Sequence, residues 1–126
     1  MLGSADLIAF VPTRDPAKAR KFYAETLGLD FISEDPFALV FNARGTPLRI
    51  ANVSEVKDFK PAPFTIVGWQ VTNVSDTLGD LAKKGVRFER FPGMDQDAKG
   101  VWKSPSGARV AWFKDPDGNI LSITQA

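Results

Sequence analysis

The sequence predicts an α+β protein that consists of two βαβββ modules in one domain, residues 1–126. Three observations carry this prediction. The length suits a single domain, and 44% apolar residues are enough for an ordinary packed core. Strand-like and helix-like segments follow one another in the same order in both halves. A glycine follows each expected helix, so we place module one at about residues 5–53, a linker at about 54–63 and module two at about 64–126.

The first module begins with a short apolar run that Pro12 closes, which predicts a buried strand. A helix is expected next, because Asp15 followed by Pro16 is a good N-terminal cap and Gly28 supplies a stop. Three strand-like segments follow the helix. The expected elements are a strand at Leu7–Val11, a helix at Pro16–Thr26 and strands at Leu29–Ser33, Phe37–Phe41 and Pro47–Asn52.

The second module repeats this order after the linker, which shows little periodicity. Asn73 or Ser75 can cap its helix, and Gly85 ends it after a run of apolar residues at helical spacing. Four segments with strand character follow the helix, so the order of the first module recurs with one additional short strand. The expected strands are Phe64–Thr72 before the helix and Val86–Phe91, Val101–Lys103, Arg109–Lys114 and Asn119–Thr124 after it.

The two halves align residue by residue near their last hairpins, where residues 38–45 match residues 111–118 at a constant offset of 73 positions. The second hairpin contains Asp115-Pro116-Asp117-Gly118. Proline fixes φ, aspartate accepts a local backbone hydrogen bond, and glycine adopts the left-handed conformation that a bulged three-residue turn requires. We therefore interpret this segment as a structural turn and not as a catalytic acid or a metal ligand.

The composition excludes several kinds of chemistry, because the chain has no cysteine and no histidine. Disulfides, thiolate nucleophiles, zinc–cysteine sites and histidine-dependent triads are all ruled out. The net charge of +1 and the lack of a basic run give no electrostatic case for nucleic acid or an anionic membrane. No apolar stretch approaches the roughly 18 residues that span a bilayer. We expect a cytoplasmic protein that binds neither nucleic acid nor membrane.

The motifs resemble those of the vicinal oxygen chelate superfamily, which includes glyoxalase I, bleomycin resistance proteins and extradiol dioxygenases. The resemblance rests on Asp15 seven residues before Phe22-Tyr23, on Leu27-Gly28-Leu29, and above all on the segment from Trp112 to Asn119. It covers nearly the whole chain. It implies that the two modules form an incompletely closed, cup-shaped sheet around a ligand cavity, and that the protein is a homodimer, as many members are.

The resemblance also indicates where a metal would be bound in metal-dependent members. Aligned on those motifs, the four positions hold Ile8, Arg49, Ser122 and either Ile66 or Val67. Two of these are apolar, one is a neutral hydroxyl, and Arg49 is a permanent cation that repels a metal ion. We therefore expect no metal and no cofactor in this chain.

Strand alternation suggests which residues line the cup. If Ser122 points inward, Trp112 shares its face, and the same register in module one places Leu39, Phe41 and Arg49 inward. In the strand at 64–72, either Gly68 and Gln70 or Val67 and Trp69 face inward, because a one-residue slip exchanges the two sets. The expected ligand contacts in the strands are Arg49, Trp112, Ser122, Gln70 and Phe41.

Each of these contacts has an alternative interpretation. The aromatic side chains either contact a ligand or simply fill a core. An inward Arg49 needs an anionic partner, which is either an internal acid such as Glu89 or Asp97 or an anionic or carbonyl group of a ligand, unless the strand register turns it outward. The long connection 91–102 is either a flap that brings Asp97 and Trp102 to a ligand or a solvated loop that Trp102 anchors.

These observations predict a metal-free protein, similar to glyoxalase and bleomycin resistance proteins, that binds a small organic ligand in an aromatic-lined cavity. The alternative is a glyoxalase-like lyase, isomerase or dioxygenase that uses a carboxylate base or an unrecognised metal site. Glu89 and Asp97 are the candidate bases, by their positions in a strand and a loop. A third possibility is a dimerising module with a filled core. The sequence does not identify a catalytic residue.

Overall fold

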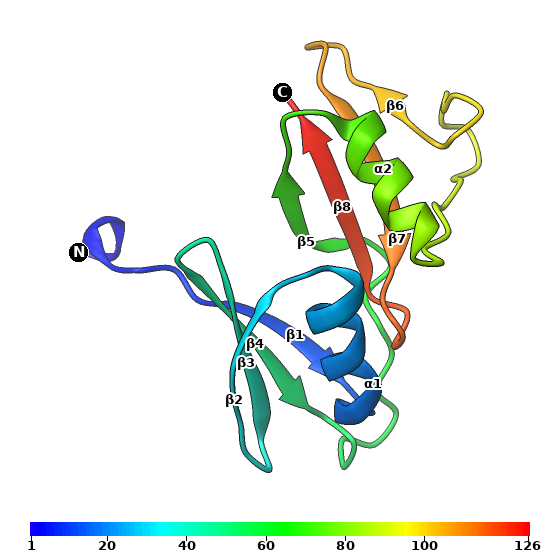
Figure 1. Cartoon of the computed structure of the whole chain (residues 1–126). Coiled ribbons are helices and arrows are strands. Elements are labelled where there is room, and N and C mark those ends of the chain that lie inside the picture. Colours follow the sequence, from blue (N-terminus) through cyan, green and yellow to red (C-terminus); the bar gives the residue numbers. More distant parts are fainter. The chain divides into compact units, whose positions relative to one another are not determined.

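The computed structural model describes all residues from Met1 to Ala126. The chain divides into two compact units, Met1–Pro61 and Ala62–Ala126. Figure 1 shows the first unit in blue to green and the second in green to red. Each unit contains one four-stranded sheet and one principal helix. The expected α+β class and the twofold occurrence of the βαβββ order are confirmed.

The first unit begins with a short 3-10 turn, Leu2–Ser4, and then follows the predicted order of elements. Its sheet has the strand order β1-β4-β3-β2, in which β1 is parallel to β4 and the other neighbours are antiparallel. The elements are β1 (Ala9–Thr13), α1 (Pro16–Lys21), β2 (Asp30–Glu34), β3 (Ala38–Ala43) and β4 (Thr46–Asn52).

The helix α1 begins where the sequence predicts, because the Asp15 carboxylate accepts a hydrogen bond from the Lys18 backbone N–H at 3.2 Å. It continues directly into a π-helical segment, Phe22–Thr26, so the helical span reaches the predicted end in a wider winding. The Leu27 N–H donates to the Phe22 carbonyl five residues back. Gly28, with φ of +73°, then turns the chain towards β2.

The predicted end of the first strand was wrong. The strand β1 starts later than predicted and continues through Pro12 to Thr13. Proline lacks a backbone N–H, but β1 lies at the end of its sheet and pairs only with β4. An edge strand tolerates proline because its other side needs no donor for the ladder.

The second unit has the strand order β5-β8-β7-β6, again with one parallel pair, β5 and β8. Asn73 is the cap of its helix, since its side-chain oxygen accepts from the Asp76 N–H at 3.0 Å, and Gly85 follows the helix with φ of +92°. The helix packs on β7 and β8 through buried apolar residues. The elements are β5 (Thr65–Gln70), α2 (Val74–Lys83), β6 (Trp102–Lys103), β7 (Arg109–Lys114) and β8 (Ile120–Gln125).

The predicted strand at Val86–Phe91 does not form. This segment runs beside β7 but makes only one bridge, Phe88 with Phe113, and one backbone hydrogen bond, from the Glu89 N–H to the Trp112 carbonyl at 2.8 Å. The backbone groups of this segment bond to the Gln96 side chain in place of a neighbouring strand. The Gln96 side chain accepts a hydrogen bond from the Phe91 N–H and donates one to the Glu89 carbonyl. Local side-chain hydrogen bonds thus replace a regular ladder here.

The two hairpins differ in the length of their turns, and this difference places Phe41 on the opposite face of the first sheet from the one predicted. In the first unit only Arg44 and Gly45 connect β3 to β4, both with positive φ, whereas residues 115–119 connect β7 to β8. Ser122 still corresponds to Arg49 at an offset of 73, but Trp112 corresponds to Val40 at an offset of 72. Phe41 therefore pairs with Leu48, and the prediction that it shares a face with Arg49 was wrong.

Candidate functional site

The face of the second sheet that is turned away from α2 carries a cluster of three aromatic side chains. Trp112 stands on β7 between Ala111 and Phe113, which are buried on the other face. The Phe91 ring meets Trp112 edge-on with centroids 5.5 Å apart, and the Trp102 ring lies 6.1 Å away at a tilt of 39°. We call Phe91, Trp102 and Trp112 the aromatic cluster. A half-exposed cluster of this kind offers ring surface for stacking.

The hydrogen bonding of Trp112 orients its ring. Its indole N–H donates to the Thr65 hydroxyl on β5 at 3.0 Å. With the only donor of the side chain engaged, Trp112 presents its ring surface and no further polar group. Polar contacts for a ligand on this face would therefore come from neighbouring strands.

Ser122 and Gln70 supply such polar groups on the same face. Ser122 pairs directly with Trp112 across β7 and β8, and Gln70 pairs with Thr124. The register thus places Gly68 and Gln70, rather than Val67 and Trp69, beside Ser122. A Cβ atom at Gly68 would collide with the Ser122 hydroxyl, so the glycine gives β5 and β8 room at this point. Ser122 itself is buried, at 7% exposure.

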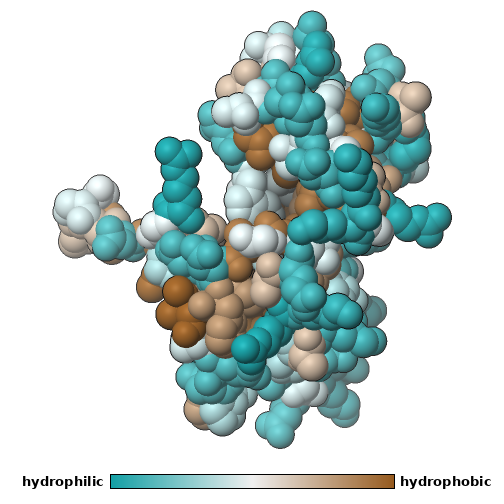
Figure 2. Space-filling model, viewed as in Figure 1, coloured by the Kyte–Doolittle hydropathy of each residue, from teal (hydrophilic) through white to brown (hydrophobic).

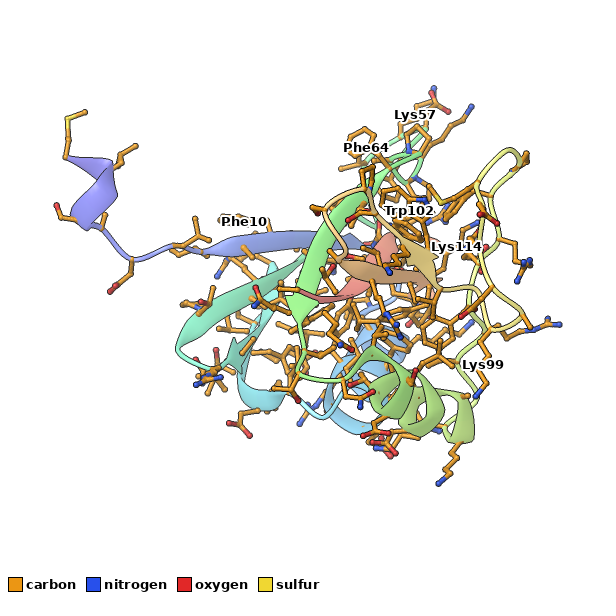
Figure 3. The ribbon with its side chains drawn as sticks, turned by 90° about the horizontal axis from the view of Figure 1, so that it is seen from above. Phe10, Lys57, Phe64, Lys99, Trp102 and Lys114 are labelled. Atoms are coloured by element: carbon orange, nitrogen blue, oxygen red, sulfur yellow. The ribbon has the colours of Figure 1, made fainter.

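The equivalent face of the first sheet has a different composition. Arg49 on β4 lies between Phe10 on β1 and Val40 on β3. Arg49 is half-buried, while Phe10 is 60% exposed and extends from β1 (Figure 3). Figure 2 shows that apolar residues gather on the surface of this unit. The pKa of the Asp35 carboxyl is lowered, first by the Phe37 and Ala38 backbone N–H groups and to a lesser degree by the Arg49 charge.

Phe41 is not on that face. It is fully buried on the α1 side of the first sheet, where its ring lies 6.1 Å from that of Tyr23 and 5.6 Å from that of Phe31. Phe41 is therefore a core residue of the first unit, and we remove it from the candidate site. Its counterpart in the second unit is Phe113, which is equally buried.

Asp97 organises the connection between Phe91 and Trp102. Its Oδ1 accepts hydrogen bonds from the Lys99 and Val101 N–H groups, each at 2.9 Å. The Val101 N–H is the largest of the influences that lower the pKa of this carboxyl. A carboxylate held as an anion in this way is a weak base, so it is a poor candidate for the general base considered from the sequence.

Asp97 also lines an open hollow of about 310 Å³ on the surface of the second unit, together with Asp95, Val101, Lys103 and Arg109. Lys103 and Arg109 form a cross-strand pair, and they alternate along β6 and β7 with Trp102 and Val110. The hollow and the aromatic cluster therefore involve opposite faces of these strands. Asp97 and Trp102, which the flap interpretation of this connection would bring to one ligand, therefore line different surfaces.

The structure gives Gln96 a role that its sequence context does not predict. Gln96 is buried and makes three hydrogen bonds, from the Phe91 N–H and to the Glu89 and Gly100 carbonyls. No sequence signal distinguishes it from a solvated amide, because glutamine is common in exposed loops. Its role depends on groups up to seven residues away that only folding brings together.

The segment 115–119 is a structural turn, as predicted. The Asp115 carboxylate accepts from the backbone N–H groups of Asp117 and Asn119 at 2.9 Å and from the Asn119 side chain at 2.8 Å. Gly118, with φ of +87°, completes it. Turn formation accounts for this motif.

The positions that the resemblance assigns to a metal do not fit a divalent ion. Ile8 and Ile66 offer no donor atom, the same is true of Val67, and Arg49 carries a positive charge. The structure contains no group of three His, Cys, Asp or Glu side chains that could hold a metal ion. Glu89, considered as a base, lies 3.7 Å from the Lys114 ammonium. These residues therefore do not form a site for a catalytic metal ion.

The family is decided by comparison with known proteins. Residues 5–123 match the model of the Glyoxalase/Bleomycin resistance protein/Dioxygenase superfamily. The chain belongs to this superfamily. No curated protein matches the chain. No helix of this superfamily member has the length and apolar character needed to cross a membrane.

Solved structures of the superfamily share the fold over nearly the whole chain. A lactoylglutathione lyase from Agrobacterium tumefaciens has 16% identity and a TM-score of 0.75, with 98% of this chain and 94% of that one covered. A superfamily member from Sphaerobacter thermophilus has 23% identity and a TM-score of 0.75, with both chains fully covered. TnmS3, an antibiotic binding protein from Streptomyces sp. CB03234, has 26% identity and a TM-score of 0.71, with 99% and 98% covered.

Proposed function

We propose that this superfamily member is a metal-free binding protein for a small organic molecule, which lies against the aromatic cluster of the second unit. The observation that carries the proposal is the pairing of Trp112 with Ser122 across β7 and β8. The resemblance assigns the position of Ser122 to a metal ligand in metal-dependent members, and here a neutral hydroxyl lies beside an aromatic ring instead. An aromatic surface beside a few polar groups is how sites for organic ligands are usually built. The likeness to TnmS3, which binds an antibiotic, supports the same class of function.

The proposed ligand is modest in size and carries an anionic or neutral polar group. The chain has a net charge of only +1, so it lacks the strong acidity that favours a large cationic ligand. On the face of the first sheet, Arg49 presents a guanidinium that matches a carboxylate or phosphate. We therefore propose Arg49 as an anion contact on the sheet of the first unit. Separately, we propose Ser122, Gln70 and Trp102 as ligand contacts on the sheet of the second unit.

The test uses two probes of the same size, 2-naphthoate and 2-naphthalenemethanol, with bleomycin as a large cationic comparison. Quenching of tryptophan fluorescence and the melting temperature report binding. At a free probe concentration of about 100 Kd, binding adds about 2.7 kcal/mol to the stability and raises the melting temperature by several degrees. We expect both probes to bind the aromatic cluster, because each presents a flat ring for stacking, and their difference in affinity reports whether the site prefers an anionic or a neutral polar group.

Matched tryptophan variants locate the probe. Trp112→Phe should reduce the quenching, because only Trp102 then reports from the cluster, whereas Trp69→Phe should retain it, because Trp69 pairs with Ile123 and belongs to the opposite face of β5. Equal effects of the two variants, or no binding of any probe, would contradict the proposed function. Metal-dependent turnover of a hemithioacetal or a catechol on addition of a divalent ion would instead establish the enzyme alternative.

We also propose that the protein is a cytoplasmic homodimer that binds no nucleic acid. The resemblance to dimeric superfamily members and the balanced charge of the chain support this. Light scattering across a range of protein concentrations gives the oligomeric state. A monomer at every concentration would contradict the dimer.

A further inference from the structure

We infer that Gln96 is a positioning residue that holds the aromatic cluster in place before a ligand arrives. This inference rests on the proposed function, since it concerns the same surface, and it gives residues 91–101 a role other than that of a mobile flap. Two members of the cluster, Phe91 and Trp102, stand at the two ends of this connection. The geometry of the cluster therefore depends on how the connection is held.

The Gln96 amide uses both of its donor hydrogens and its acceptor oxygen, and these bonds reach both ends of the connection. Its oxygen accepts from the Phe91 N–H at 2.8 Å, and its NH2 group donates to the Glu89 carbonyl at 2.9 Å and to the Gly100 carbonyl at 2.7 Å. One buried side chain thus joins the backbone that carries Phe91 to the backbone that precedes Trp102. Buried amides satisfied in this way specify a single arrangement.

A second set of hydrogen bonds reinforces the same arrangement from outside. The Arg90 guanidinium donates to the Asp97 carbonyl at 2.8 Å and to the Gln96 carbonyl at 3.1 Å. The Asp97 carboxylate accepts from two N–H groups of the following turn. Gln96 also forms a bridge with Trp102, which begins β6. Hydrogen bonds within the connection and to the adjacent Arg90 therefore hold it in one conformation.

This arrangement affects binding because the aromatic rings are already ordered before the ligand arrives. Ordering a mobile side chain costs free energy at the moment of association, and a surface fixed in advance avoids that cost. Phe91 belongs to no strand, and Trp102 belongs to the two-residue strand β6, which pairs with β7 on one side and forms the bridge to Gln96, so the order of both rings depends in part on the connection. Trp112 is fixed within β7 and by Thr65. Loosening the connection should therefore displace two rings and leave the third.

The experiment compares Gln96→Glu with Lys99→Ala in the full chain. Glutamate keeps the length of the side chain and the acceptor for Phe91, but its carboxylate cannot donate to the two carbonyls. Lys99 is exposed on the same connection, which runs along one side of the unit and ends at Trp102 (Figure 3). The readouts are the exciton couplet of the Trp102–Trp112 pair in far-ultraviolet circular dichroism and the Kd for 2-naphthoate.

We expect Gln96→Glu to lose the couplet and to bind 2-naphthoate about tenfold more weakly, with Lys99→Ala unchanged in both. Retention of the couplet and of the affinity in Gln96→Glu would overturn the inference. If that variant fails to fold, Gln96→Met replaces it, because methionine keeps a side chain of similar size but loses all three hydrogen bonds without burying a charge, and the same two outcomes apply. Loss of the couplet in a protein that binds no probe would support the positioning role while refuting the proposed function.

Discussion

The two units build corresponding sheet faces from very different side chains. Arg49 lies between Phe10 and Val40 in the first unit, and Ser122 lies between Gly68 and Trp112 in the second. The large apolar residue is on the first strand in one unit and on the third strand in the other. One repeated backbone therefore carries a cationic face and an aromatic face, and equivalence of position does not mean equivalence of chemistry.

The hairpins explain why this difference is hidden in the sequence. The hairpin of the first unit has a two-residue turn, and that of the second has a five-residue turn. As a result, β3 corresponds to β7 at an offset of 72 residues, whereas β4 corresponds to β8 at an offset of 73. A change of one residue reverses the face to which every side chain of a strand belongs. Matching strings of sequence are therefore a poor guide to matching faces when a turn differs in length.

The largest expected effect tests this alignment. Phe41→Ala and Phe113→Ala should each lower the free energy of unfolding by about 3–5 kcal/mol, because both rings are fully buried at corresponding positions. Val40→Ala, on the more open face, is the control and should cost about 1 kcal/mol. Urea unfolding measures all three. A Phe41 variant as mild as the Val40 variant would show that Phe41 does not belong to the core.

A smaller effect distinguishes the two hairpin turns. Asp115→Ala should cost about 2–3 kcal/mol, because it removes the buried acceptor of two backbone N–H groups and one amide. Gly45→Ala in the shorter turn should cost about 1–2 kcal/mol, through the positive φ of +89° alone. Unfolding by urea at neutral pH measures both. The interpretation of 115–119 as the structural turn fails if Asp115→Ala is neutral.

The smallest effect concerns acid sensitivity and compares one carboxyl from each unit. The pKa of Asp35 is lowered mainly by the Phe37 N–H and that of Asp97 mainly by the Val101 N–H. A lowered folded pKa means that the stabilisation is complete above the ordinary value, near pH 4, and is lost as the pH falls through the folded value. Asp35→Asn and Asp97→Asn should each make the stability fall less steeply below about pH 4.

The control for this pH dependence is Asp95→Asn, an exposed aspartate in the same connection as Asp97. Urea midpoints at several pH values between neutral and about pH 3 provide the comparison. An Asp97 variant whose slope equals that of the wild type would show that the backbone N–H groups do not hold the carboxylate. The two units can then be compared directly, since each test changes one carboxyl in one unit.

Much of the candidate site could be predicted from local patterns, and some of it could not. The pairing of Trp112 with Ser122 follows from the hairpin signature at 115–119, and it was confirmed. The role of Gln96 and the location of Phe41 could not be predicted in this way. Gln96 depends on carbonyls and N–H groups that meet only in the folded loop. The face on which Phe41 lies depends on the length of the turn between β3 and β4, and the residues of that turn are compatible with more than one turn geometry.

The sequence by itself determined the class of elements, their order and most of their ends. Caps such as Asp15 and Asn73, the glycines after the helices and the periodicity of apolar residues act over a few neighbouring residues, so they can be interpreted without knowing the fold. The sequence also excluded a histidine or cysteine metal site. Only the tertiary structure decided which face each strand presents, because that depends on the registers of neighbouring strands, and these are set by how turns close and how side chains such as Gln96 find distant partners.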